Sequence, residues 1–407
     1  MDGLVIGLAL CDSYTQVNCG GQEKVWAFPT VICRKKNEDM WFVGEEAYGF
    51  TLTGEGVIVD KLLNLARKNG TATIGDIKFT GQELLERFIE QAIALPAEAY
   101  GTEQIRQMVV ALPNVDNRTM DCLLYCADHL KIPRSHFHVI SYSESFLYYV
   151  LSQEQNIWKN QVGLFDLSQK GLRYYEMKVV KGLRQTLVLS DYENLDEGVD
   201  LDVLETQAGA RLADRILCAC GERLLAKKTF SAIFLTGRGF EKPEWASDFT
   251  KLAARRRRVF SEPYIFAMGA ACKAMDHLAK ETAFPFVLIC EGRLKATISM
   301  EVVHEEKTTQ LVIAASGDSW YEAKSTMEFI LDHQDELIFQ IQPVDQKKKS
   351  EVKIPLKGFP ERPERTTRIQ LKTGFKNENT MAVVIKDKGF GELFPASDTE
   401  IRREIVL

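Results

Sequence analysis

The chain has 407 residues, of which 45% are hydrophobic and 27% charged, proportions typical of a globular protein with two or three domains. A net charge of -6 argues against a nucleic-acid-binding surface, and no uncharged stretch is long enough to span a membrane. The nine cysteines are scattered and odd in number, and the N-terminus lacks the basic segment of a signal peptide, so we expect reduced thiols in a cytoplasmic protein.

In the first 160 residues, strand-like apolar runs alternate with helical patterns. Residues 81–95 repeat apolar side chains at three- and four-residue spacing, and Thr80 with Glu83 forms a capping-box signature at the start of that helix. A second helix is predicted from Asn117 to Leu130, and the mixed order predicts an α/β fold. The strand-like runs of this region and its continuation are Leu4–Leu10, Val25–Cys33, Gln107–Leu112 and Val162–Leu167.

A second α/β half is predicted from about Gln161. Three consecutive antiparallel strands are expected over residues 162–167, 172–180 and 182–190. A helix over Glu205–Lys227, a strand over 232–237 and a further helix from near Tyr264 follow. Because each half opens with a strand, a turn and a strand, the order of elements indicates an internal duplication.

From about Phe284 the period changes from helical to alternating, with Pro- and Asn-containing turns between short runs. This pattern predicts an antiparallel β-sandwich. The predicted strands cover residues 294–303, 308–316, 337–344, 350–356, 367–373 and 381–387.

Five segments, taken in order, resemble the seventy-kilodalton heat-shock chaperone family, within the superfamily that also contains actins and sugar kinases. They are AFPTVICRKKNEDMWFVGEEAYGF, VVALPNVDNRTMDCLLYCADHLKIPRSHFHVISYSESFLYYVL, VGLFDLSQKGLRYYEMKV, AIFLTGRGFEKPEW with SEPYIFAMGAACKA, and IPLKGFPERPERTTRIQLKTGFKNENTMAVVIKDKGFGE. The resemblance covers nearly the whole chain, but the helical lid of the chaperones has no counterpart.

This resemblance implies a two-lobed actin-like ATPase fold with ribonuclease-H-like halves, followed by a β-sandwich like the chaperone peptide-binding domain. The implied nucleotide-binding domain spans 1–283, with lobes of about 1–160 and 161–283. A small subdomain that clamps adenine in the family is truncated to about 191–231. The implied β domain spans 284–407.

The first phosphate loop departs from the family pattern. The resemblance places Ala9 where the family has a metal-binding Asp, Cys11 at its Gly and Asp12 at its first Thr. Glycine lets backbone amides approach phosphate oxygens, and a carboxylate holds magnesium and its water shell, so these exchanges remove both functions. Asp12 would lie close to bound phosphates and repel them.

The second phosphate loop is altered as well. Asp166 keeps a family acid, but Ser168, Gln169 and Lys170 replace three glycines, and Arg173 replaces the next acid. A lysine or arginine side chain attracts phosphate without rebuilding a cradle of backbone amides. The alternative is that both segments are simply hairpins that hold the fold together.

Other residues match the family and are implied to act on nucleotide. Lys61 matches a catalytic lysine, and Glu144 and Asp166 match acids that hold the metal's water shell. Lys61 and Glu144 each have a structural alternative, a solvated helix lysine and an acid stabilised at a helix start. The matches around adenosine are Gly237, Gly239 and Gly269, for which turn geometry and close helix packing are the alternatives.

The family's peptide-binding loops correspond to Thr308–Phe329. The candidate contacts are Leu311, Ile313, Trp320, Tyr321 and Met327. Filling of the sandwich core is the alternative, which is favoured for Leu311 and Ile313. Because Trp320 and Tyr321 follow a Gly-Asp-Ser turn, at least one is expected to be exposed on a loop.

Three functions fit the sequence. The favoured one is a chaperone-like pseudo-ATPase whose lidless β domain binds a polypeptide or protein partner. The alternatives are an active chaperone ATPase and an actin-like cytoskeletal or cell-division protein. The cofactor is ATP or ADP with magnesium, or none. We expect no metal held by protein residues alone, no nucleic-acid partner and no membrane partner.

Overall fold

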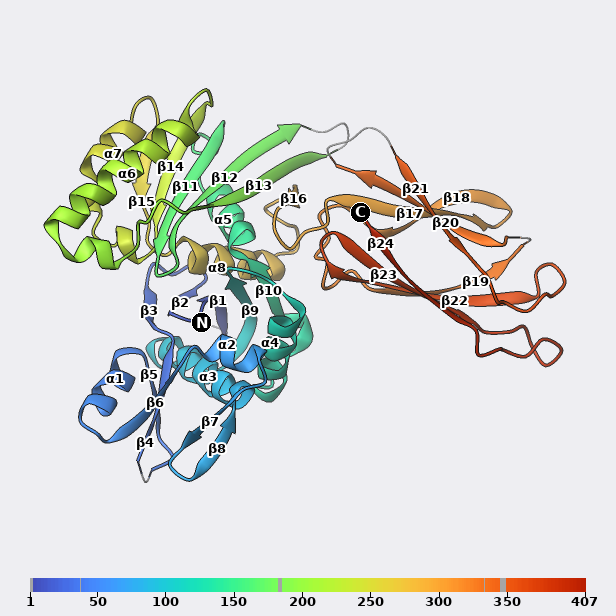
Figure 1. The fold of residues 1–407 in the computed structure, drawn as a ribbon, viewed down its shortest axis with the longest axis horizontal. Coiled ribbons are helices and arrows are strands. Elements are labelled where there is room, and N and C mark those ends of the chain that lie inside the picture. Colours follow the sequence, from blue (N-terminus) through green and yellow to red (C-terminus); the bar gives the residue numbers. More distant parts are fainter. Residues whose placement is uncertain (1–2, 37, 182–184, 333, 345–348) are drawn as a thin grey trace. The chain divides into compact units, whose positions relative to one another are not determined.

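The structure is a computed structural model that describes residues 3–36, 38–181, 185–332, 334–344 and 349–407. The chain divides into two compact units, Met1–Phe286 and Val287–Leu407, which are described separately (Figure 1). About 28% of the chain is helix and 41% is strand, which places it in the mixed α/β class. The N-terminal residues of the strand predicted at 182–190 lie outside the described residues.

The first sheet of unit 1 has the strand order β10-β9-β1-β2-β3. Strands β1, β9 and β10 are parallel, whereas β1, β2 and β3 form an antiparallel meander. Nearly all side chains of β1 are buried, as expected for a strand covered on both faces. The bounds are β1 Leu4–Leu10, β2 Tyr14–Cys19, β3 Val25–Pro29, β9 Ile105–Leu112 and β10 Phe137–Ser141.

Within unit 1, five strands of a second sheet repeat this arrangement in the order β15-β14-β11-β12-β13. Again the first three strands in the chain are antiparallel neighbours and the last two are parallel to the first. The predicted antiparallel trio is confirmed. The bounds are β11 Gln161–Ser168, β12 Gly171–Lys181, β13 Thr186–Leu195, β14 Phe230–Thr236 and β15 Arg258–Ser261.

The long helices pack on these sheets. Helix α8 packs across β1 and β9, and α5 packs against α8. This approach is close, because a side chain on Gly7 would lie 2.2 Å from the backbone nitrogen of Ala271 in α8. The bounds are α3 Gly81–Tyr100, α4 Asn117–His129, α5 Tyr142–Leu151, α6 Gln207–Leu225, α7 Ser247–Ala253 and α8 Ile265–Leu278.

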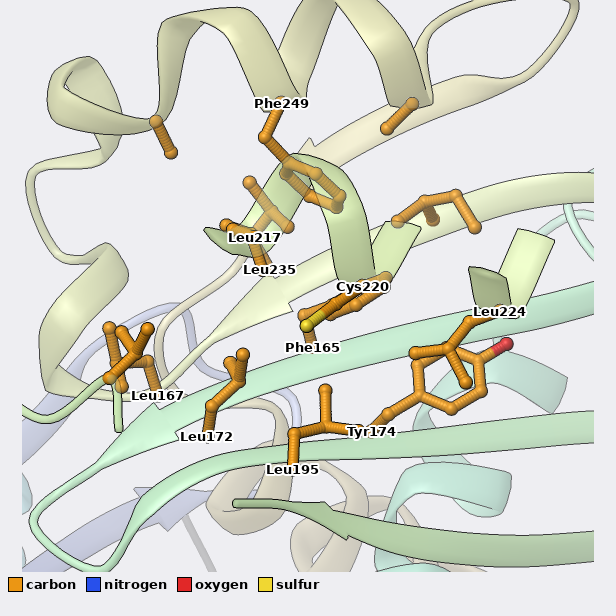
Figure 2. Close-up of a cluster of buried hydrophobic side chains, with 14 of the residues drawn as sticks. Phe165, Leu167, Leu172, Tyr174, Leu195, Leu217, Cys220, Leu224, Leu235 and Phe249 are labelled. Carbon is orange, nitrogen blue, oxygen red and sulfur yellow. The ribbon is translucent and has the colours of Figure 1, made fainter. Parts of the chain in front are cut away.

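An apolar core joins α6 and α7 to the second sheet (Figure 2). Phe165 of β11 lies edge-on to Phe249 of α7, with ring centroids 4.9 Å apart, and Leu217 of α6 belongs to the same cluster. Burying such side chains contributes about 1.5–3 kcal/mol each. This core holds the end of β11 that leads into the candidate site, because Phe165 and Leu167 lie just before the turn that begins at Ser168.

Smaller elements, including two separate sheets, β5-β4-β6 and β7-β8, follow β3 in the chain. The predicted run Val25–Cys33 is wrong as a single strand, because it breaks at Thr30 into β3 and β4, which belong to different sheets. Thr30 is buried and its hydroxyl shares a 2.7 Å hydrogen bond with that of Thr15. The bounds are β4 Val31–Lys35, β5 Trp41–Val43, α1 Gly44–Leu52, β6 Gly56–Asp60, α2 Leu62–Arg67, β7 Thr71–Ile74 and β8 Ile77–Thr80.

Unit 2 contains two four-stranded antiparallel sheets, β18-β17-β20-β21 and β19-β22-β23-β24, drawn one over the other in Figure 1. Alternate residues of β20 and β23 are buried, which gives each sheet one apolar face. Strands β19 and β24 were absent from the expected set. The bounds are β16 Val287–Ile289, β17 Ala296–His304, β18 Lys307–Ala314, β19 Ser325–Leu331, β20 Glu336–Pro343, β21 Ser350–Pro355, β22 Thr367–Asn377, β23 Thr380–Asp387 and β24 Glu400–Val406.

Candidate functional site

Two hairpin turns of unit 1 line one cavity. The β1–β2 turn contributes Cys11 and Ser13, and the β11–β12 turn contributes Ser168, Gln169 and Lys170. The second turn is tight, because Ser168 and Gly171 close the strand pair around two residues. The structure therefore brings together the two turns that the sequence singled out.

The inner wall of the cavity is formed by buried groups. Asp166 and Gln16 are 5% and 8% exposed, and Tyr142 and Phe266 stack with ring centroids 4.0 Å apart. Burial raises the pKa of the Asp166 carboxyl to about 7, and the charge of Arg173 lowers it only in part. Asp166 accepts no hydrogen bond from the residues that the structure describes, so little offsets the cost of burying its charge.

Arg173 crosses the cavity from β12. Its guanidinium donates to the Asn194 side-chain oxygen at 2.7 Å, to the Tyr175 hydroxyl at 3.2 Å and to the Pro113 carbonyl at 3.5 Å. Pro113 follows β9 in the first sheet, whereas β12 lies in the second. This side chain thus links the two sheets through the space between the turns.

The enclosed space is small. The cavity volume is about 60 Å³, whereas pockets for ligands of drug size measure about 300–1,000 Å³. The described conformation therefore leaves no room for a nucleotide between the turns. Arg173, Tyr142 and Phe266 are among the side chains that line this space.

The first turn is held by its own contacts. Ala9 is buried in β1 between Gln16 of β2 and Ala111 of β9. The Cys11 thiol donates to the Tyr14 carbonyl at 3.2 Å. These interactions hold the turn in the described conformation.

Asp12, which was expected to lie close to a bound phosphate, has a partner within unit 1. Its carboxylate accepts a 2.9 Å hydrogen bond from the backbone N–H of Asn64. Asn64 lies in the first turn of α2, where backbone N–H groups lack partners within the helix. Asp12 therefore caps α2 from a distant part of the chain.

The matched Lys61 and Glu144 do not line the cavity. Lys61 is exposed and precedes α2 in a left-handed conformation with φ of 52°. Glu144 is buried in the first turn of α5, where its backbone N–H donates to the Ser141 hydroxyl at 3.1 Å. Of the three residues implied to be catalytic, Asp166 alone reaches the cavity.

The three matched glycines are all places of close approach. A side chain on Gly237 would lie 2.5 Å from the Asp166 carboxylate, and one on Gly239 would lie 2.5 Å from Leu167. Gly269 is where α8 crosses α5, because a side chain there would lie 1.9 Å from the Ser145 carbonyl oxygen. Only Gly237 of these three lines the cavity.

The predicted exposure of Trp320 or Tyr321 in unit 2 is wrong. Both are buried, at 3% and 8% exposure, with their rings edge-to-face at 5.5 Å. The turn before them folds back, and the Trp320 N–H donates to the Gly292 carbonyl at 3.2 Å. Leu311 and Ile313 are half-buried on one face of β18, and Met327 is half-buried on β19.

Sequence reasoning missed Gln16, Tyr142 and Phe266. Gln16 carried a usable signal, because it is polar within β2 and faces Ala9 across the strand pair. Buried polar side chains of this kind either find a partner or mark a site. Tyr142 and Phe266 carried no such signal, since each is an aromatic residue near the start of a largely buried helix, where such residues usually pack in the core.

Fold and site together define a mixed α/β protein with a small cavity between two hairpin turns and a separate β unit. The chain belongs to the family described as "Family of unknown function (DUF5716) C-terminal", whose model matches residues 13–291, more than half of its length. Residues 293–407 match a "Domain of unknown function (DUF8552)". The comparison with curated proteins finds no match. Among the described helices, none combines the length and apolar character needed to cross a membrane.

Proposed function

We propose that unit 1 is a divergent two-lobed actin-like ATPase fold of the heat-shock-chaperone type. The support is the repeated strand order, β10-β9-β1-β2-β3 and β15-β14-β11-β12-β13, with a hairpin turn after the first strand of each set. A repeat of five strands with one topology fits two ribonuclease-H-like halves. Fold alone leaves function open, so the remaining argument rests on the sites.

The nucleotide function is lost in this proposal. Phosphate binding needs backbone amides that approach the ligand and a metal held near it. Here Gln169 and Lys170 form a two-residue turn after Ser168, Arg173 spans the space, and the remaining volume is about 60 Å³. The protein thus acts without ATP or magnesium.

Polypeptide binding is assigned to unit 2, and one observation carries it. Edge strand β18, Lys307–Ala314, carries a charge only at its first residue, Lys307, and none from Thr308 to Ala314. Natural edge strands are commonly protected by charges, because their free N–H and C=O groups pair readily with another strand. The other three edges of unit 2 carry charges: Glu328 on β19, Glu351 and Lys353 on β21, and Glu400, Arg402, Arg403 and Glu404 on β24.

The hairpin of β17 and β18 extends this surface. Strand β17 pairs with β20 only over Ala296–Ser299, whereas it pairs with β18 as far as His304. The apolar side chains Val303 and Val312 are 74% and 53% exposed along it. An extended segment that adds beside β18 would gain backbone hydrogen bonds and contacts with Val312.

The test is binding of a labelled, uncharged Val- and Thr-rich peptide to the full-length protein, followed by fluorescence anisotropy. We expect a dissociation constant in the micromolar range or weaker, about -8 kcal/mol at best. Val312→Lys should weaken binding, whereas Val406→Lys on the charged edge β24 should leave it unchanged. Equal loss in both variants, or equal binding of a matched peptide with alternate prolines, contradicts the proposal.

Calorimetry with Mg-ATP, together with an assay of phosphate release, tests whether unit 1 has lost nucleotide binding and hydrolysis. We expect no heat of binding and no phosphate release, because no cradle or space remains for the triphosphate. Turnover that Lys61→Ala abolishes would replace this proposal with an active chaperone ATPase.

A cytoplasmic location is part of the same proposal. All nine cysteines are free, and six of them are buried. Unpaired buried thiols fit a reducing compartment.

A further inference from the structure

One polar group in the cavity of unit 1 has no partner. The side-chain oxygen of Gln16 is buried and accepts no hydrogen bond among the described residues. Its nitrogen donates to the Pro263 carbonyl oxygen at 3.5 Å, and this contact assigns the amide orientation that leaves the oxygen without a donor. A buried acceptor without a donor is costly, so this oxygen indicates a missing donor.

The second acceptor is Asp166. Its carboxylate also lines the cavity and receives no hydrogen bond from the described residues, although Arg173 is its cross-strand neighbour. The Arg173 guanidinium donates instead to Asn194, Tyr175 and Pro113. Two buried acceptors thus share one small space.

Aromatic rings form part of the walls. Tyr142 and Phe266 stack on each other at the base, and Tyr14 lies nearer the mouth with Arg238 over its ring at 4.9 Å. Aromatic faces attract cations, and a carboxylate beside them strengthens that preference. The Arg173 guanidinium also lines the cavity but donates to Asn194, Tyr175 and Pro113, so the acceptors at the base are left for a compact ammonium group.

The mouth has the opposite character. Lys170 and Arg238 both line the cavity, and both are exposed. Neither forms an ion pair within the part of the chain that the structure describes. Cations at the rim above acceptors at the base suit a ligand with a negative group at one end and an ammonium at the other.

We propose that this cavity binds a small amino acid. Its ammonium group donates to Gln16 and Asp166 at the base, and its carboxylate lies at the mouth beside Lys170 and Arg238. A volume of about 60 Å³ admits a head of this size and excludes a nucleobase or sugar. This ligand is independent of the polypeptide assigned to unit 2.

The experiment is calorimetry and thermal denaturation of the full-length protein with glycine, β-alanine and 4-aminobutyrate as probes. Propylamine and propionate serve as matched ligands that lack one end of β-alanine. We expect at least one amino acid to bind, and each single-ended ligand to bind about tenfold more weakly or worse, a difference of about 1.4 kcal/mol. Binding of propionate as tight as that of the amino acid overturns the proposal and leaves an anion site. No binding of any amino acid at up to ~10 mM also overturns it and leaves a site for water alone.

Variants locate the ligand. Gln16→Leu and Asp166→Asn should each abolish binding, and Lys170→Ala should reduce the affinity to that of the amine alone. Gln107→Leu is the matched control, because Gln107 is also buried with an unpartnered side-chain nitrogen but does not line the cavity. Circular dichroism confirms folding of each variant. Loss of binding in Gln107→Leu, or retention in a folded Asp166→Asn, contradicts the assignment.

Discussion

At Asp166, burial works against the charge. The carboxyl is 5% exposed, and its pKa is raised from 3.8 to about 7, chiefly by burial, with Arg173 lowering it in part. Between these two values the folded state holds a proton that the unfolded state has released. The free energy of unfolding therefore falls as the pH rises through this window, and the loss is complete above about 7.

Replacing this carboxyl should remove that dependence. In Asp166→Asn, we expect the unfolding free energy to lose the part of its decrease between about pH 4 and 7 that comes from the Asp166 carboxyl. At pH 8 the variant should be more stable by up to about 4 kcal/mol, the value of a shift from 3.8 to about 7. Urea denaturation across pH measures this, with the exposed Asp191→Asn on β13 as control. An unchanged slope in Asp166→Asn would contradict the assignment of the raised pKa.

Gly269 shows a second effect at the scale of one residue. Its missing side chain lets α8 approach α5, where the Ser145 hydroxyl donates to the Phe266 carbonyl at 2.6 Å. A methyl group there would lie 1.9 Å from a backbone oxygen, which cannot move without shifting the helix. Glycine destabilises the helix relative to alanine, but at this position it allows the close packing of α8 against α5.

Gly269→Ala should destabilise the protein by about 1–3 kcal/mol through overpacking. Gly49→Ala should have the opposite sign, because Gly49 lies in α1 with nothing within 4 Å of an added side chain. Alanine at such a helical position is favoured over glycine by about 0.5–1 kcal/mol. Chemical denaturation of both variants decides between these effects, and a stabilising Gly269→Ala would show that α8 is free to move.

At the scale of elements, α2 depends on a residue far away in the chain. Helix α2 spans only Leu62–Arg67, and Lys61 before it provides no side-chain cap. The Asp12 carboxylate supplies the missing acceptor through the Asn64 N–H and also suits the positive end of the helix. The first hairpin turn therefore positions the helix that begins after Lys61.

Asp12→Ala should cost about 1 kcal/mol, as loss of a helix cap does. The effect should be local, with faster hydrogen exchange in α2 and unchanged exchange in α3, which has its own capping box. Asp12→Asn should retain most of the protection, because an amide oxygen also accepts the bond. Equal exchange in wild type and Asp12→Ala would show that the bond does not hold α2.

Elements governed by local interactions were predictable from sequence. Helix α3 begins at the expected capping box, where Thr80 and Glu83 bond each other's backbone. The break at Thr30 and the burial of Trp320 were not predictable, because both depend on contacts with distant segments, Thr15 and Gly292. The cavity depends on both kinds of interaction. Its two turns follow from the pairing of neighbouring strands and were predictable, whereas its small volume depends on the distant contact of Arg173 with Pro113 and was not.

At the scale of the molecule, unit 2 has the features of an independent domain. It holds two four-stranded sheets with buried faces. A buried ion pair also fixes the chain between β23 and β24: Arg362 donates twice to Asp387, at 2.8 and 2.7 Å, and the N–H groups of Gly389 and Ser397 donate to the same carboxylate. Although burial alone would raise the pKa of Asp387, these four bonds hold it well below its usual range.

We therefore expect residues 287–407 to fold when expressed alone. Trp320 is the single tryptophan of this segment and is 3% exposed, so its fluorescence should report an apolar environment and shift cooperatively on urea denaturation. Arg362→Ala should lower the midpoint strongly, because it leaves the Asp387 charge buried without its partner, at a cost of about 3–5 kcal/mol. Arg365→Ala is the control, since Arg365 pairs with Asp332 on the exposed surface, where an ion pair contributes about 0–1 kcal/mol. Fluorescence typical of exposed tryptophan without a cooperative transition would show that unit 2 requires unit 1 to fold.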